Sequence, residues 1–167
     1  MDMLLDLKSL FSGEQDTLPC TCDLSLSETE FNGGYPFVTP IAVEGIAKAA
    51  YGSVELTASV AFDYEAPCDR CTALTKRRYH YQFSHILSDS PEKEEDDDVI
   101  QIGPERTLDL DELLRSDILL ELPYKYLCSE DCKGLCASCG KNLNEGPCGC
   151  NLHQVDPRLE VLKKLID

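Results

Sequence analysis

Eight cysteines stand at metal-ligand spacing, and they constrain the fold of this chain more than any other feature of its sequence. Two form a Cys-x-x-Cys motif in the middle of the chain, and six crowd into its last quarter. The eight are Cys68, Cys71, Cys128, Cys132, Cys136, Cys139, Cys148 and Cys150. Thiolates at such spacing bind tetrahedral zinc without help from other ligands. The sequence therefore predicts a C-terminal segment that is shaped by metal ligands more than by packing.

Spacing alone allows two ways of grouping these cysteines. In the first, the four distal thiols hold one zinc ion, and the other four hold a second ion that fastens the tail to the sheet. The distal thiols are Cys136, Cys139, Cys148 and Cys150. In the second, one ion is shared and Cys68 and Cys71 remain a free dithiol. That shared ion is held by Cys132, Cys136, Cys139 and Cys150. The prediction is therefore one or two ions; zinc is preferred, although iron also binds four thiolates.

The N-terminal segment does not resemble a targeting signal. It lacks a basic stretch, acids interrupt its apolar residues, and no part of the chain approaches the length of a membrane span. We therefore expect a cytoplasmic protein that is not associated with a membrane. Thiols stay reduced in that compartment, which favours metal over disulfides for the 10 cysteines. The remaining two, Cys20 and Cys22, fall in an expected strand and are interpreted as small residues on a sheet.

Alternating apolar and polar residues predict antiparallel strands at 41–50, 53–64 and 76–87, with a turn at Tyr51-Gly52-Ser53 between the first two. The Cys-x-x-Cys motif at 68–71 then lies in the loop between two strands. An apolar stripe predicts a helix over 110–121, with Asp109 as its N-cap and Pro123 ending it. The expected fold class is α+β: an antiparallel sheet, one or two packing helices and a zinc-stapled, cysteine-rich segment.

Two domains are expected. Residues 1–123 form the antiparallel β domain, which includes a solvated acidic loop at 89–98 and the helix at about 110–121. Residues 124–167 form the cysteine-rich zinc-binding tail. This tail ends in a short helix that starts at Pro157, after the N-cap Asp156, and runs to about Ile166.

The cysteines are interpreted as structural ligands rather than as catalytic groups. A catalytic zinc site keeps an open position and commonly uses His or Glu ligands, whereas thiols are in surplus here and there are only 3 His residues. A thioredoxin-like redox pair needs a strand followed by a helix, but strands flank Cys68 on both sides. No motif of a known catalytic class is present. We therefore expect no enzyme, no catalytic residue and no small-molecule substrate.

The charge of the chain limits how it can bind RNA. The formal net charge is −16, and the absence of Trp argues against a stacking platform for single-stranded nucleic acid. RNA contact would have to use a local basic patch on a strand, its turn and the metal-binding segment. The candidate contact residues are Arg70, Lys76, Arg77, Arg78, Lys133 and Lys141. The alternative interpretation of these residues is an ordinary solvated surface.

Several motifs occur together in one order along the chain. They are Cys-Asp-Arg-Cys at 68–71, Leu-Pro at 122–123, Cys-Lys-Gly-Leu-Cys-Ala-Ser-Cys-Gly at 132–140, Cys-Gly-Cys at 148–150 and Asp-Pro-Arg-Leu at 156–159. This combination, over residues 40 to 167, resembles the YceD family, also called the domain of unknown function 177 (DUF177). It is far more specific than any single Cys-x-x-Cys motif.

The resemblance implies a bacterial or plastid factor for accumulation of large-subunit (23S) ribosomal RNA, and hence a role in ribosome biogenesis. The implied partner is pre-50S ribosomal RNA or a large-subunit ribosomal protein. The family offers no catalytic residues to transfer. It also implies that Cys68 and Cys71 pair with Cys128 and Cys132, because members without the distal thiols tend to keep those two pairs. The alternatives are a zinc-stapled adaptor unrelated to RNA and a thiol oxidoreductase.

Overall fold

The computed structural model describes residues 3–90 and 99–150, and the chain divides into two compact units. The first unit combines Met1–Ala66 with Lys76–Tyr124. The second combines Pro67–Thr75 with the chain from Lys125 onward. The loop that carries Cys68 and Cys71 therefore belongs to the same unit as the cysteine-rich tail. The predicted helix from Pro157 lies outside the described residues, as do residues 91–98 of the predicted acidic loop.

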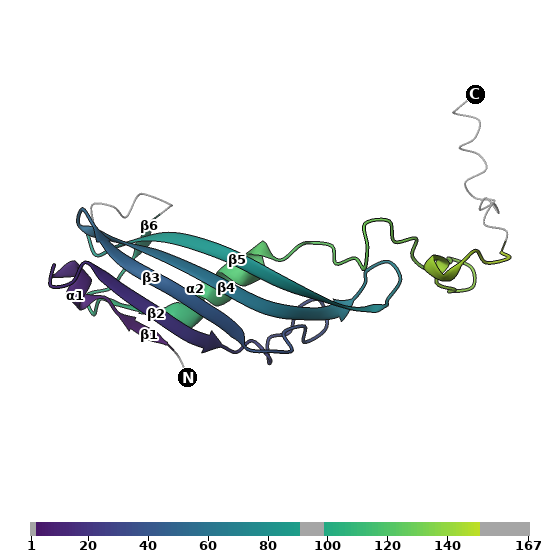
Figure 1. Cartoon of the computed structure of the whole chain (residues 1–167), viewed down its shortest axis with the longest axis horizontal. Coiled ribbons are helices and arrows are strands. Elements are labelled where there is room, and N and C mark those ends of the chain that lie inside the picture. The colour runs from purple at the N-terminus through teal and green to yellow at the C-terminus, as the bar shows by residue number, and fades with distance from the viewer. Residues whose placement is uncertain (1–2, 91–98, 151–167) are drawn as a thin grey trace, which may run out of the picture. The chain divides into compact units, whose positions relative to one another are not determined.

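The first unit is built on a five-stranded sheet in the order β2-β3-β4-β5-β6 (Figure 1). Its strands are β2 (Thr17–Leu24), β3 (Ile41–Ala50), β4 (Ser53–Pro67), β5 (Leu74–Ser88) and β6 (Val99–Gln101). β2 and β3 pair antiparallel, as do β3 and β4, whereas β6 runs parallel to β5. The predicted α+β class with a mostly antiparallel sheet is confirmed, and β6 makes the sheet mixed.

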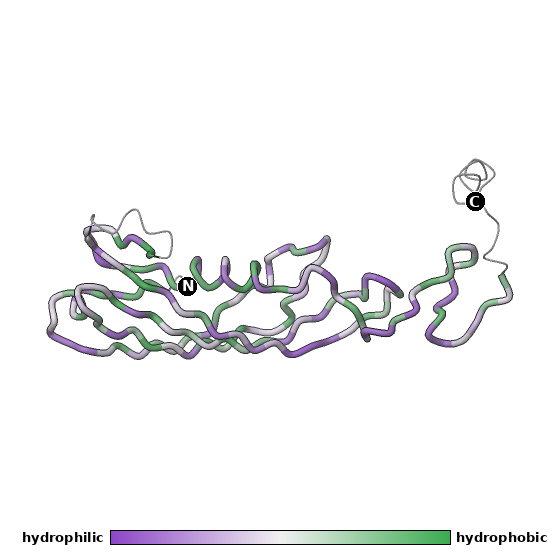
Figure 2. Tube along the Cα trace, turned by 90° about the horizontal axis from the view of Figure 1, so that it is seen from above, coloured by the Kyte–Doolittle hydropathy of each residue, from purple (hydrophilic) through white to green (hydrophobic). Residues whose placement is uncertain are grey.

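The β3–β4 hairpin follows directly from the sequence pattern. Ala50 pairs with Ser53 across a two-residue turn in which Tyr51 (φ 45°) and Gly52 (φ 79°) both adopt left-handed backbone conformations. Such turns match the twist of a hairpin. Along β4 every second residue is buried, and Figure 2 shows apolar and polar residues alternating along the strands. The buried residues of β4 are Val54, Leu56, Ala58, Val60, Phe62 and Tyr64.

One helix, α2 (Leu110–Glu121), packs on the buried face of the sheet (Figure 1). The side chain of Asp109 accepts a hydrogen bond from the backbone N–H of Glu112 at 3.0 Å, which satisfies a free donor of the first turn. His85 of β5 contacts Asp117 of the helix at 2.7 Å, so the two elements are joined by a polar bond as well as by packing. The predicted bounds and N-cap of this helix are confirmed.

Several short elements were not expected from the sequence, among them the 3-10 turn η2 (Leu143–Glu145). β1 (Leu4–Asp6) and β7 (Thr107–Asp109) form a separate two-stranded sheet, α1 (Lys8–Phe11) follows β1, and β6 extends the main sheet. Three- and four-residue segments are too short to show a period. Within the described ranges, no helix is both long and apolar enough to cross a membrane.

Candidate metal centres

The first candidate metal-binding loop joins β4 to β5. The backbone N–H of Cys68 donates to the carbonyl of Ala73 at 2.9 Å, and the N–H of Thr72 donates to the carbonyl of Cys68 at 2.8 Å. Thr72 adopts φ 58°, in the left-handed region that β-branched residues rarely enter. This tight loop turns Cys68 and Cys71 toward each other.

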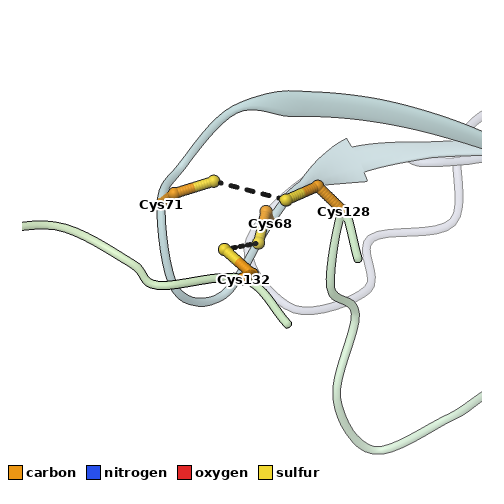
Figure 3. A group of neighbouring side chains, drawn as sticks. All are labelled: Cys68, Cys71, Cys128 and Cys132. Carbon is orange, nitrogen blue, oxygen red and sulfur yellow. Dashed lines mark hydrogen bonds between the residues drawn. The ribbon is translucent and has the colours of Figure 1, made fainter. Parts of the chain in front are cut away.

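The tail supplies two more thiols to this loop, as Figure 3 shows. Cys68 Sγ lies 3.8 Å from Cys132 Sγ, and Cys71 Sγ lies 3.6 Å from Cys128 Sγ. All four sulfur atoms lie within 4.8 Å of one another. Cys68, Cys71 and Cys132 are buried and Cys128 is half-buried. We call these four residues the proximal cluster.

The sulfur spacing of the proximal cluster fits a tetrahedral metal site. Four sulfur atoms bound to zinc at about 2.3 Å lie about 3.8 Å from one another. The contacts of 3.6 and 3.8 Å agree with that spacing. They are much longer than the roughly 2.05 Å of a disulfide bond. Four thiolates would complete the tetrahedral shell of one ion.

The second candidate metal-binding loop repeats the geometry of the first. The N–H of Cys136 donates to the carbonyl of Lys141 at 2.8 Å, and the N–H of Gly140 donates to the carbonyl of Cys136 at 2.9 Å. Gly140 has φ 72°, and it follows Cys139 as Thr72 follows Cys71. Each Cys-x-x-Cys motif is therefore closed by two equivalent backbone hydrogen bonds. In each motif the residue after the second cysteine adopts a left-handed backbone conformation.

The distal cluster consists of Cys136, Cys139, Cys148 and Cys150, whose sulfur atoms also lie within 4.8 Å of one another. The structure thus groups the eight thiols in the first of the two ways that spacing allows. The clusters differ in exposure. In the distal cluster only Cys136 is buried, whereas Cys139 is exposed and the other two are half-buried.

Electrostatics in the proximal cluster favour a bound cation. Burial raises the pKa of Cys68, but backbone N–H groups, first that of Cys128, outweigh it and lower the pKa to about 6. At Cys71 the N–H of Ala73 lowers the pKa, while burial and the neighbouring thiols raise it to about 12. The thiols therefore do not all ionise together: the lowered pKa lets Cys68 lose its proton easily, whereas burial and hydrogen bonds to the neighbouring thiols keep Cys71 protonated. A divalent cation would remove this conflict by binding all four as thiolates.

The distal cluster also combines one thiol of lowered pKa with one thiol of raised pKa. The backbone N–H groups of Cys139 and Ser138 lower the pKa of Cys136 to about 6. The thiol of Cys139 raises the pKa of Cys150 to about 12, and burial adds to this effect. Both clusters are therefore suited to a cation that neutralises several thiolates at once.

Polar contacts hold the tail against the proximal loop. Asp69 and Tyr126 exchange two bonds: the N–H of Asp69 donates to the Tyr126 carbonyl at 2.9 Å, and the N–H of Tyr126 donates to Asp69 Oδ2 at 2.7 Å. The Tyr126 hydroxyl donates to the carbonyl of Thr75 at 2.8 Å. Gly134 (φ 74°) lies so close to the loop that a Cβ there would be 3.1 Å from the carbonyl oxygen of Arg70. None of these contacts could be predicted from the sequence, because they depend on the tertiary fold.

The candidate RNA-contact residues of the second unit make internal contacts. Arg70 donates from Nη1 to the carbonyls of Cys132 at 2.9 Å and Glu130 at 3.4 Å. Lys141 donates from Nζ to the carbonyl of Pro147 at 3.2 Å. The side chain of Lys133 is exposed, while its backbone N–H donates to Asn144. Arg70 and Lys141 thus help to hold the loops.

The other three candidates lie in the first unit, one after another on β5. Lys76 forms an ion pair with Asp63 at 3.0 Å. Arg77 and Arg78 are exposed. Successive strand residues point to opposite faces of a sheet, so Lys76 and Arg78 share a face and Arg77 points to the other.

Cys20 and Cys22 lie on β2, as expected. Cys20 is buried and packs where Gly45 of β3 leaves room, since a Cβ at Gly45 would lie 2.7 Å from the Cys20 sulfur. Neither residue belongs to a group of three or more possible metal ligands among the described residues.

Comparison with known proteins gives one family match. A family model described as "Large ribosomal RNA subunit accumulation protein YceD" matches residues 56–166. That range contains every cysteine of the two clusters. No solved structure matches the chain.

Three relatives illustrate the range of similar proteins. An uncharacterised protein of Mycobacterium tuberculosis is 28% identical over 155 residues, which cover 90% of this chain and 72% of the relative. The uncharacterised protein YlbN of Bacillus subtilis is 29% identical over 143 residues, covering 83% of this chain and 81% of YlbN. The large ribosomal RNA subunit accumulation protein YCED homolog 1, chloroplastic, of Arabidopsis thaliana is 26% identical over 151 residues. That match covers 73% of this chain and 47% of the plant protein.

Proposed function

The chain belongs to the YceD family of large ribosomal RNA subunit accumulation proteins, and on this basis we propose that it is a non-enzymatic, zinc-binding factor for accumulation of large-subunit ribosomal RNA. In this proposal it acts in the cytoplasm by binding pre-50S ribosomal RNA or a large-subunit ribosomal protein. The observation that carries the zinc assignment is the pair of four-thiol clusters, each with all of its sulfur atoms within 4.8 Å of one another.

A structural role for zinc follows from the chemistry of these ligands. A site with four thiolates has no open position for water or substrate, which is the usual arrangement of structural zinc. With eight thiols engaged, neither Cys-x-x-Cys motif remains as a redox pair. The zinc supplies binding energy that couples directly to folding of the second unit. The chain's own residues shape the loops and supply thiolates.

The charge of the protein bears on the choice of partner. The chain has a formal net charge of −16. Each zinc ion bound by four thiolates would add a net charge of about −2. RNA contact therefore depends on a local group of basic side chains. The proposed residues are Lys76, Arg77 and Arg78 on β5. A basic ribosomal protein is the partner that the overall charge would favour.

Affinity purification from cells tests the proposal. We expect the tagged, full-length chain to recover large-subunit precursors, and ribonuclease treatment before capture distinguishes the partners. A ribosomal protein that stays bound after treatment supports the protein partner, whereas loss of all ribosomal material supports RNA contact. Partners unrelated to the ribosome in both samples would contradict the proposal and support the adaptor.

The role of the basic residues needs a matched pair of variants. Arg78→Glu and Lys48→Glu each replace an exposed basic side chain on the main sheet by an acidic one. If β5 contacts RNA, Arg78→Glu lowers precursor recovery and Lys48→Glu does not. Equal recovery by both variants would remove the β5 patch from the proposal and leave the protein partner.

A further inference from the structure

Asn144 belongs to the distal loop but contacts the proximal cluster. It lies between Cys139 and Cys148, in the 3-10 turn η2 (Leu143–Glu145). Its amide Nδ2 donates to the sulfur of Cys132 at 3.3 Å. Its Oδ1 accepts the backbone N–H of Lys133, the residue after Cys132, at 2.8 Å. The side chain thus uses both ends of its amide on one metal-ligating segment.

The position of this amide depends on the fold of the distal loop. Asn142 Oδ1 accepts bonds from the backbone N–H and the Nδ2 of Asn144 at 3.0 and 2.9 Å. The N–H of Leu143 donates to the carbonyl of Gly134 at 2.9 Å. On either side of this turn, Cys139 and Cys148 belong to the distal cluster. An ion bound by Cys139 and Cys148 would therefore also fix the turn between them. That turn places the Asn144 amide against Cys132.

We propose that Asn144 is a positioning residue that couples the two metal sites, so that an ion in the distal cluster strengthens binding of an ion in the proximal cluster. This rests on the proposed function, because it requires both clusters to bind zinc. An N–H group that donates to a ligating thiolate stabilises its charge and fixes its direction. Coupling between two binding sites is reciprocal, so the proximal ion strengthens the distal one by the same factor.

The exposure of the two clusters sets the order in which they lose metal. Three of the four proximal thiols are buried, whereas three of the four distal thiols are open to solvent in whole or in part. A chelator must reach the sulfur–metal bonds, so it removes the distal ion first. Loss of that ion frees the loop around Asn144 and removes a hydrogen bond from Cys132. Loss of the distal ion therefore promotes release of the proximal ion.

Zinc release from the full-length, zinc-loaded chain to a chromogenic chelator tests this inference. The wild type should release two ions in two phases. Asn144→Asp keeps an oxygen for the Lys133 N–H but loses the donor to Cys132. We expect it to bind two ions still, but to bind the proximal ion about 10 to 100 times more weakly while the distal site is filled, the usual effect on affinity of removing a partner of a metal ligand. Release of the proximal ion should then no longer wait for release of the distal ion. Asn144→Gln, which restores an amide, should recover part of the difference.

The matched control is Glu145→Ala, which changes an exposed residue of the same turn. It should release both ions at the wild-type rates. A second readout uses Cys148→Ser, which disables the distal site without touching Asn144. Its proximal site should bind Co2+, followed by the thiolate-to-metal absorption band, about as weakly as the Asn144→Asp proximal site does.

The outcomes separate this inference from the proposed function. If the wild type binds two zinc ions but Asn144→Asp releases them at wild-type rates, the coupling is absent and the zinc assignment stands. An unchanged Co2+ affinity of the proximal site in Cys148→Ser would overturn the coupling in the same way. If the wild type binds no zinc, the proposed function itself fails.

Discussion

Thr72 and Gly140 hold the same left-handed backbone conformation, each directly after the second cysteine of a Cys-x-x-Cys motif. Their N–H groups donate to the carbonyls of Cys68 and Cys136, at 2.8 and 2.9 Å. The chain thus contains one loop geometry twice, with glycine in the distal copy and a β-branched residue in the proximal copy. Thr72 bears the cost of that conformation, which its hydroxyl, 2.7 Å from the carbonyl oxygen of Cys71, helps to offset.

The left-handed position predicts that Gly140→Ala destabilises the distal loop. A Cβ at Gly140 meets nothing within 4 Å, so the cost comes from the backbone and amounts to about 1 to 2 kcal/mol. Zinc affinity of the distal site, measured by chelator competition, should fall accordingly. Gly149→Ala is the control, because it also has open space but no left-handed φ. Equal loss of affinity in both variants would contradict this account of Gly140.

Metal content should follow the grouping of the thiols. Native mass spectrometry of the purified chain should show two zinc ions, and Cys148→Ser should lose one. Cys68→Ser should lose the proximal ion because, among residues 3–90 and 99–150, the proximal group contains four thiols and no fifth. Cys22→Ser, on β2, should retain two ions. A chain that keeps both ions after either cluster substitution would show that the ligands are assigned wrongly.

The bonds between Asp69 and Tyr126 predict a loss of stability in Asp69→Ala. The carboxylate accepts the Tyr126 N–H at 2.7 Å, and hydrogen bonds to charged groups contribute about 1.5 to 3 kcal/mol. Unfolding of the zinc-loaded protein in guanidinium, followed by zinc release, should shift to lower denaturant. Asp131→Ala changes an exposed acid of the same unit and should leave the midpoint unchanged. A shift of the same size in Asp131→Ala would mean that net charge, not the bond, is responsible.

The environment of the Tyr79 hydroxyl predicts that Tyr79→Phe does not destabilise the folded protein. Among the described residues this hydroxyl is a buried oxygen without a hydrogen-bond partner, and the Tyr79 ring lies 5.8 Å from Phe62 and 5.6 Å from Tyr81. An unpaired buried polar group costs about 1 to 3 kcal/mol. Tyr79→Phe should therefore unfold at the wild-type temperature or above it in thermal denaturation. Tyr81→Phe, which loses a bond to the Glu121 carbonyl, should be less stable than Tyr79→Phe.

Much of the first unit could be predicted because its signals are local. The β3–β4 hairpin follows from strict alternation and a Tyr-Gly turn, and α2 from its apolar stripe and the Asp109 cap. The strands β1, β6 and β7 are three residues long, which is too short for any period. Their pairing depends on where the rest of the chain places them.

The candidate site divides in the same way. The spacing of the cysteines indicated the candidate ligands but left their grouping open, because Cys68 and Cys132 lie 64 residues apart in the sequence. Only the folding of the tail against the β4–β5 loop decides between the two groupings. Asn144 had no signal at all, since asparagine is common in turns and its bond to Cys132 depends on the tertiary fold.

Synthesis of the chain separates the two halves of the proximal cluster in time. Cys71 leaves the ribosome 57 residues before Cys128, and Cys68 leaves it 64 residues before Cys132. At about 5 to 20 residues per second, the first pair waits roughly 3 to 13 s for the second. Until then the two thiols can offer an ion only half of a tetrahedral shell. In a zinc-bound protein, capture of the proximal ion would thus be possible only in a chain already made as far as Cys132, and a prematurely ended chain would stay open at this loop.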